Sequence, residues 1–200
     1  MKKHEEYLDS VALVVDRFGV RGVSMVQIAR ALGISKATLY NNFGTQTQLL
    51  EALVEYQNGL LRERVVSISS RHNLDPLMIL VRVLDYVALS YYKRSSLFIT
   101  TLHENYPVIY DYMNRLNSRL LEEFFALNIP RGRSQDLYRG DFKTDIIASL
   151  CFSILRTVDD SWSDPSGMSF EQYRREVVLF VLRSIIAPSL QGRLVDLGSE

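Results

Sequence analysis

The sequence has little of what marks a secreted or membrane protein, or one with a strong overall charge. Cys151 is its single cysteine, which excludes an intramolecular disulfide framework and fits a reducing compartment. No stretch approaches the roughly 18 uncharged apolar residues of a membrane span. The first ten residues carry acidic side chains where a signal peptide needs an apolar run. We therefore expect a soluble, cytoplasmic protein with no membrane partner.

The net charge gives no global indication of a nucleic-acid partner. Lysine plus arginine and aspartate plus glutamate number 23 each, so a binding surface for an anionic polymer has to be local. Groups of residues with catalytic spacing are also missing, because we find no paired carboxylates, no nucleophile with a base and no phosphate-binding glycine loop. No second histidine or cysteine stands at ligand spacing near His103. The sequence thus predicts no enzyme, no metal and no cofactor.

Signals for β-structure are nearly absent, whereas apolar residues recur at helical spacing throughout. Three segments have the capping-box form, in which a hydroxyl and an amide satisfy free backbone donors at a helix start: Ser24–Gln27, Thr45–Gln48 and Ser169–Gln172. The sequence therefore predicts an all-α protein, with 128–141 as the most loop-like stretch. The expected helices lie near 4–18, 24–31, 35–42, 45–70, 75–94, 96–104, 107–127, 141–162 and 169–187.

Residues 24–43 have the pattern of two short helices joined by a tight turn. Gly33 lies at the junction, where a sharp turn needs a positive φ, and Ser35 can cap the helix that follows. Leu39 and Phe43 are then expected to face a common core. This arrangement predicts a helix-turn-helix, in which the second helix offers side chains to the major groove of DNA.

The side chains left outside on the second helix have chemistry that suits DNA. Lysine contacts phosphate or guanine, asparagine bridges an adenine edge, threonine and alanine meet a thymine methyl group, and tyrosine donates to phosphate. Helix starts at Ser24, Ser35 and Thr45 also offer backbone donors to phosphate oxygens. From spacing alone, a solvated polar helix face is an equally good interpretation.

The run of residues 19–53, "GVRGVSMVQIARALGISKATLYNNFGTQTQLLEAL", resembles the DNA-binding region of TetR/AcrR-type bacterial transcriptional regulators. The matching motifs are Ile28-Ala29, Gly33-Ile34-Ser35, and Thr38-Leu39-Tyr40 with Phe43. The resemblance implies a DNA surface at Ser24, Ser35, Lys36, Ala37, Thr38, Tyr40 and Asn41, to which the helix start at Thr45 is added. It also implies a DNA-binding domain over 1–45 and a ligand-binding and dimerisation domain over 46–200.

One position departs from the family pattern. Gln46 stands where such regulators usually have a lysine that contacts phosphate, and residues 1–48 hold six basic against four acidic side chains. Few phosphate contacts are expected from so weak a charge balance. A relative that has lost DNA binding, and acts through protein contacts instead, therefore stays as the alternative.

The larger domain is rich in aromatic side chains, most of which suit core packing. The resemblance implies a cavity for a small effector of apolar or aromatic character between its middle helices. By helical facing, eight side chains are predicted to line it: Tyr86, Tyr92, Phe98, His103, Tyr110, Met113, Phe152 and Trp162. A lone histidine such as His103 is more often a structural hydrogen-bond donor than a ligand contact.

The last two long helices lie near 141–162 and 169–187 and carry apolar residues on more than one side. Each apolar side needs a packing partner that shields it from water. Pairing with a second copy would cover them, as the resemblance also implies. The sequence as a whole predicts a ligand-responsive homodimeric transcriptional regulator, a repressor, that binds a near-palindromic operator. An all-helical enzyme is the third possibility, and nothing in the sequence supports it.

Overall fold

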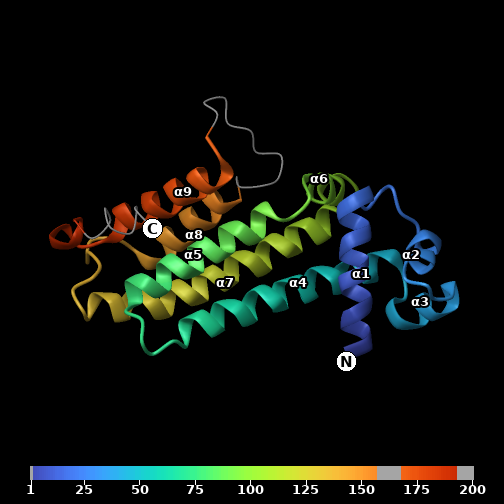
Figure 1. The fold of residues 1–200 in the computed structure, drawn as a ribbon, viewed down its shortest axis with the longest axis horizontal. Helices are drawn as coiled ribbons and strands as arrows, with labels where there is room; N and C mark the ends of the chain where they lie inside the picture. Colours follow the sequence, from blue (N-terminus) through green and yellow to red (C-terminus); the bar gives the residue numbers. More distant parts are fainter. Residues whose placement is uncertain (1, 157–167, 193–200) are drawn as a thin grey trace. The chain divides into compact units, whose positions relative to one another are not determined.

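The computed structural model describes residues 2–156 and 168–192, and over these residues the chain is helical (Figure 1). The helices are α1 (Lys2–Phe18), α2 (Met25–Ala31), α3 (Lys36–Phe43), α4 (Gln46–Ser69), α5 (Pro76–Tyr92), α6 (Ser96–Asn105), α7 (Pro107–Arg133), α8 (Thr144–Leu155) and α9 (Phe170–Ile185), followed by a 3-10 turn (Pro188–Leu190). In the described residues β-structure is limited to one isolated bridge between Tyr138 and Ile186. The predicted all-α class is confirmed. Every described helix is too short or too polar to cross a membrane.

The three helix starts predicted from capping boxes are confirmed, whereas the helix expected near 141–162 begins only at Thr144, after its N-cap Lys143. Ser24 and Ser169 each accept from the backbone three residues on, and the glutamine there accepts from the cap backbone, which completes both capping boxes. Thr45 does the same for α4, because its N–H donates to the Gln48 side chain over 2.8 Å and its Oγ1 accepts from the Gln48 N–H over 3.2 Å. Local hydrogen bonding alone therefore determines these boundaries.

The expected end of α7 near residue 127 is wrong, because the helix continues to Arg133 with Pro130 inside it. The extra turn is held by contacts with the chain that follows. Arg133 donates from Nε to the Arg139 carbonyl over 3.0 Å and from Nη2 to the Phe142 carbonyl over 2.6 Å. The ring of Tyr138 lies where a Cβ would stand at Gly132. These later residues offset the hydrogen bond that proline removes.

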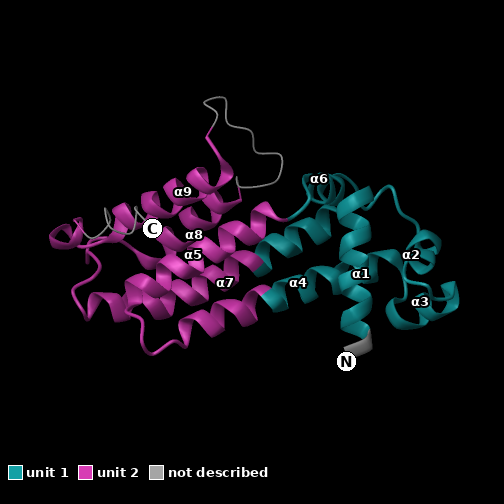
Figure 2. Cartoon of the chain, viewed as in Figure 1, with its two compact units in different colours: residues 1–60, 94–116 teal, residues 61–93, 117–200 magenta. Residues whose placement is uncertain are grey.

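The chain divides by packing into two compact units, which Figure 2 shows in different colours. Unit 1 holds residues 1–60 and 94–116, and unit 2 holds 61–93 and 117–200, so α4 and α7 each contribute to both. This division describes packing. The functional boundary expected between residues 45 and 46 stays a prediction.

Unit 1 buries one apolar cluster formed by α1, α2, α3, the first half of α4, α6 and the start of α7. Leu39, Leu49 and Phe98 are fully enclosed in it. Leu39 comes from α3, so the core that carries α3 also includes α4 and α6. The orientation of α3 therefore depends on its packing against α4 and α6.

Unit 2 buries a second cluster, formed by the later part of α4, α5, the later part of α7, α8 and α9. The segment after α7 is tied to the end of α9, because the Arg139 N–H donates to the Ile185 carbonyl and the Ala187 N–H donates to the Leu137 carbonyl. Cys151, on α8, is buried among these residues.

Burial raises the pKa of the Cys151 thiol to about 12, so the thiol stays protonated at physiological pH. Because the thiolate is the nucleophile, we expect almost no alkylation of the native protein by iodoacetamide at mildly alkaline pH. In concentrated guanidinium chloride the same residue should react completely. Mass spectrometry before and after unfolding measures both states, and rapid labelling of the native protein would contradict the packing of α8.

Candidate nucleic-acid interface and ligand cavity

The turn between α2 and α3 has the geometry that a glycine permits. Gly33 has φ of 66°, its N–H donates to the Arg30 carbonyl over 3.1 Å, and the Ile34 N–H donates to the Ala29 carbonyl over 3.0 Å. These two bonds form a Schellman motif, which ends α2 and redirects the chain. The Cβ of a substituted side chain would meet no atom within 4 Å, so the requirement for glycine comes from the backbone alone. The predicted helix-turn-helix is therefore present.

Capping and burial orient α3. The Thr38 N–H donates to Ser35 Oγ over 3.0 Å, so Ser35 is the predicted N-cap. Leu39 and Phe43 are buried in the core of unit 1, as predicted. The remaining side chains of the helix point away from this core, so α3 is attached by one side and presents the other.

The outward side of α3 carries the residues expected there. Lys36, Ala37, Tyr40 and Asn41 are exposed, and Thr38 is half-buried. The Lys36 ammonium lies 5.4 Å from the centre of the Tyr40 ring, so the two side chains form a cation–π pair. A lysine, a phenol and an amide are thus grouped on one exposed helical face.

The three helix starts expected to contact DNA are also exposed. Ser24, Ser35 and Thr45 use their hydroxyl oxygens to cap their own helices. An α-helix leaves its first backbone N–H groups without an intrahelical acceptor, and a side-chain cap satisfies only one or two of them. The remaining donors suit phosphate oxygens.

Gln46 has an inward role that sequence reasoning missed. Its Nε2 donates to the Val20 carbonyl over 3.2 Å and to the Val23 carbonyl over 2.9 Å. Both carbonyls belong to the turn between α1 and α2, so the amide holds that turn against the start of α4. The uncharged residue at this position is explained by this internal contact. An amide next to a helix cap, where the family has a lysine, was the only signal in the sequence.

Gln46→Ala should lower the free energy of unfolding by about 1 to 2 kcal/mol, because two partly buried carbonyls lose their donor. Thr47→Ala is the matched control, since Thr47 is the next residue of the same helix and is exposed. A change of less than about 0.5 kcal/mol is expected there. Urea unfolding of both variants measures the difference, and equal stabilities would remove the structural role of Gln46.

A second contact holds the same turn from α6. The Val20 N–H donates to Thr101 Oγ1 over 2.9 Å, and that hydroxyl donates to the Leu97 carbonyl over 2.7 Å. Helices α1 and α6 also pack against each other directly. Within unit 1, the turn that precedes α2 is therefore held by both α4 and α6.

In unit 2 a cavity of about 540 Å³ opens between α4, α5 and α7. Its volume lies in the range of small-molecule sites. Its apolar wall consists of Val65, Val66, Ile79, Leu120, Phe124 and Leu127, and its polar groups come from Arg62, Ser69, Ser70, Glu123, Asn128 and Arg131. Such a wall with a few polar groups suits an apolar ligand that carries a polar end.

An ion pair lies at the edge of this cavity. Arg62 Nη1 is 2.7 Å from Glu123 Oε2, and Arg119 Nε is 3.2 Å from the other carboxylate oxygen. Hydrogen bonding to Arg62, helped by Arg119, lowers the pKa of Glu123 below its ordinary value. The carboxylate is therefore ionised at neutral pH, and this pairing weakens only as the pH falls through that lowered pKa.

The comparisons with known proteins agree with this geometry. Residues 14–53 match the family model described as bacterial regulatory proteins, tetR family. Over these residues the chain is similar to the TetR family. A comparison with curated protein sequences gave no match.

Solved structures extend the likeness in fold to most of the chain. PfmR, a TetR family transcriptional regulator from Thermus thermophilus, matches with 24% identity and a TM-score of 0.66 over 88% of this chain and 97% of its own. AibR in complex with isovaleryl coenzyme A and operator DNA matches with 23% identity and a TM-score of 0.62 over 88% and 96%. A transcriptional regulator from Cytophaga hutchinsonii matches with 19% identity and a TM-score of 0.70 over 92% and 99%. At these identities the shared property is the TetR-type fold.

The structure places the eight predicted ligand residues in different surroundings. Phe98, His103, Tyr110 and Met113 belong to unit 1, whereas Tyr86, Tyr92 and Phe152 belong to unit 2, and Trp162 lies outside the described residues. Phe98 is enclosed in the core, and the exposed His103 has its ring 4.5 Å from that of Tyr110. The Tyr92 ring stacks on Phe170 at 3.4 Å. None of the seven that the structure describes lines the cavity between α4, α5 and α7.

The residues that do line this cavity were missed because the prediction favoured aromatic side chains. The sequence contained no signal for them. In the structure, Val66 and Leu127 are apolar, yet 55% and 73% of their surfaces are exposed, which marks an open apolar surface at the cavity.

Proposed function

We propose that the protein is a homodimeric, ligand-responsive repressor that binds a near-palindromic operator in the cytoplasm. The outward side of α3 carries this proposal, because a capped helix held by Leu39 and Phe43 presents Lys36, Tyr40 and Asn41 together. The same face is the one that a recognition helix offers to the major groove. We expect few contacts between the protein and DNA phosphates, since the Gln46 side chain is hydrogen-bonded to the turn before α2.

Unpaired apolar surface on the last helices supports the dimer. On α8, Ile146 and Leu150 are 54% and 53% exposed, and on α9 Phe180 is 61% exposed. The other apolar residues of α9 are buried or half-buried within the same chain, so its inner side is already covered. A second copy would cover the outer side, and two copies would present α3 helices to major grooves about 34 Å apart.

The cavity between α4, α5 and α7 supports an effector with an apolar body. The similar AibR was solved with a ligand and operator DNA together, and α4 in this chain supplies residues both to the cavity and to unit 1. A ligand that moves α4 would therefore act on the DNA-binding domain through one continuous helix. The ligand shifts the equilibrium between a DNA-binding and a non-binding arrangement of the protein only if its affinity for the two arrangements differs.

Selection of the purified protein on random duplex DNA, at low and moderate salt, tests the proposal. We expect an enriched inverted repeat bound by two protomers, with a shallow dependence of log affinity on log salt. Failure to enrich any sequence at both salts would overturn the operator-binding role. It would favour the alternative, a TetR-type protein that acts through protein contacts.

A further inference from the structure

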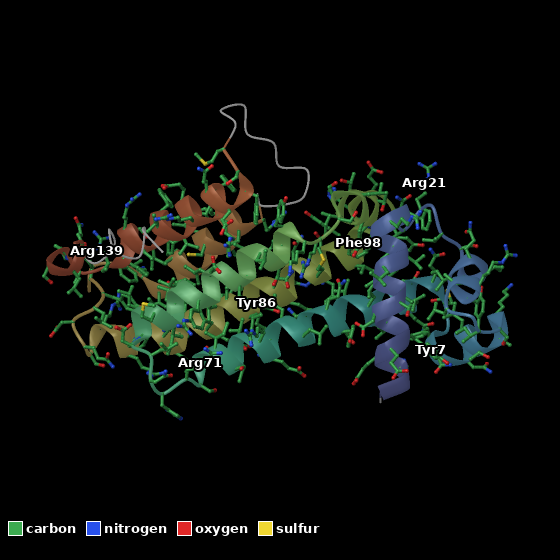
Figure 3. All side chains as sticks on the ribbon, viewed as in Figure 1. Tyr7, Arg21, Arg71, Tyr86, Phe98 and Arg139 are labelled. Atoms are coloured by element: carbon green, nitrogen blue, oxygen red, sulfur yellow. The ribbon has the colours of Figure 1, made fainter. Side chains whose placement is uncertain are left out.

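A second pocket of unit 2 has a different chemistry from the apolar cavity. It lies between the end of α4 and α5, and its volume is about 200 Å³. Figure 3 labels two of its residues, Arg71 just after α4 and Tyr86 on α5. The arginine pocket, as we call it, is lined mainly by Arg64, Arg71, Arg82, Asp85 and Tyr86.

The charge in the arginine pocket is unbalanced. Among the described residues, Arg64, Arg71 and Arg82 form no ion pair with a carboxylate, in contrast to Arg62 and Arg119 on the same unit. The single carboxylate in the pocket, Asp85, lies 2.6 Å from Arg174 Nη1, so its charge is already balanced. Three guanidinium groups thus surround one hollow without an anion of their own.

The hollow is formed by packed side chains rather than by mobile surface groups alone. Ile68, between Arg64 and Arg71 on the chain, is buried, and Tyr86 and Leu89 are half-buried. The Arg64 guanidinium lies 5.6 Å from the centre of the Tyr86 ring, a cation–π contact that restricts its position. Asp85 is restricted in turn by Arg174, of which only 18% of the side-chain surface is exposed.

We propose that the arginine pocket binds a small dianion that presents its charge on oxygen atoms, as a phosphate group or a dicarboxylate does. Guanidinium groups form paired hydrogen bonds with such oxygens, and three arginines line this pocket, Arg64 from α4, Arg71 from the turn after it and Arg82 from α5. The volume is smaller than that of a drug-sized ligand site, so the occupant is a compact anion or the anionic group of a larger molecule. As a binding site the proposal is independent of the DNA-binding role, and only its use as an effector site rests on that role.

Calorimetric titration of the whole chain, without DNA and at constant ionic strength, tests the proposal. The probes are inorganic phosphate, malonate and acetate. We expect saturable binding of phosphate or malonate with a Kd below about 1 mM, and no saturation with the monoanion acetate. Tighter binding of phosphate identifies a phosphate-bearing ligand, and tighter binding of malonate identifies a dicarboxylate.

Matched variants separate the pocket from general surface charge. Arg71→Gln and Arg82→Gln should each weaken binding about tenfold or more, because each removes charged hydrogen-bond donors. Arg119→Gln removes the same charge from α7 outside the pocket and should leave the affinity unchanged. Absence of saturation with both dianions, or equal weakening in all three variants, would overturn the proposal. Selection on random DNA is a separate readout, so a loss of operator binding is not mistaken for a loss of anion binding.

Discussion

Leu150→Glu is expected to convert the protein to a monomer and to lower its operator affinity about 100-fold or more. Leu150 is exposed on α8 beside Ile146, and Phe180 is the exposed large apolar residue of α9. A glutamate there would place a charge within the proposed apolar interface, where burial of an unpaired carboxylate is costly. A monomer would then hold one half-site and lose the gain from simultaneous binding of two. Light scattering during size-exclusion chromatography measures the mass, and a mobility shift measures the affinity.

Val108→Glu is the control for this substitution. Val108 is 74% exposed at the start of α7 and belongs to unit 1, so the substitution introduces the same charge at an exposed apolar position that is not on α8 or α9. We expect this variant to remain dimeric. A dimeric Leu150→Glu variant with normal operator affinity would show that α8 and α9 are not the interface.

Lys36→Ala and Tyr40→Ala are each expected to weaken operator binding about tenfold, with the unfolding free energy nearly unchanged. Both side chains are exposed on α3 and contribute nothing to the core. Removal of Lys36 should also make the slope of log affinity against log salt shallower by about one unit, the share of one phosphate contact. Removal of the uncharged Tyr40 should leave this slope unchanged. Because the two side chains touch, the double variant is expected to depart from additivity.

Two further variants complete this experiment. Lys143→Ala removes an exposed lysine from the segment before α8 and should leave operator affinity unchanged. Tyr40→Phe keeps the ring beside Lys36 and removes the hydroxyl. A loss of affinity in this variant would come from a hydrogen bond between the hydroxyl and phosphate, whereas unchanged affinity would mean that the ring acts by orienting Lys36. Normal affinity in both Lys36→Ala and Tyr40→Ala would remove α3 from the DNA surface.

Features encoded by short-range hydrogen bonds could be predicted from the sequence. The capping pairs and the glycine turn lie within six residues of their partners, so the residue types are sufficient to locate them. Ser35, Gly33 and Leu39 therefore have the positions and conformations that the pattern indicates. The outward side of α3 follows from these local facts.

Features that depend on distant parts of the chain could not be predicted. The end of α7 depends on Arg133 reaching the segment near Phe142, and the role of Gln46 depends on carbonyls 23 and 26 residues earlier. The cavity between α4, α5 and α7 depends on how three helices approach one another, which helical periodicity does not specify. Aromatic content indicated the wrong residues because most large side chains serve to fill the cores.

The burial of Cys151 makes the chain suitable for site-specific spectroscopy without removal of a native thiol. A cysteine introduced at the exposed Thr47 would be the only group that a thiol-directed spin label reaches in the folded protein. A homodimer would then carry one label near each DNA-binding domain and would report a single distance between them. That distance, followed during addition of operator or effector, would measure directly how the two domains separate.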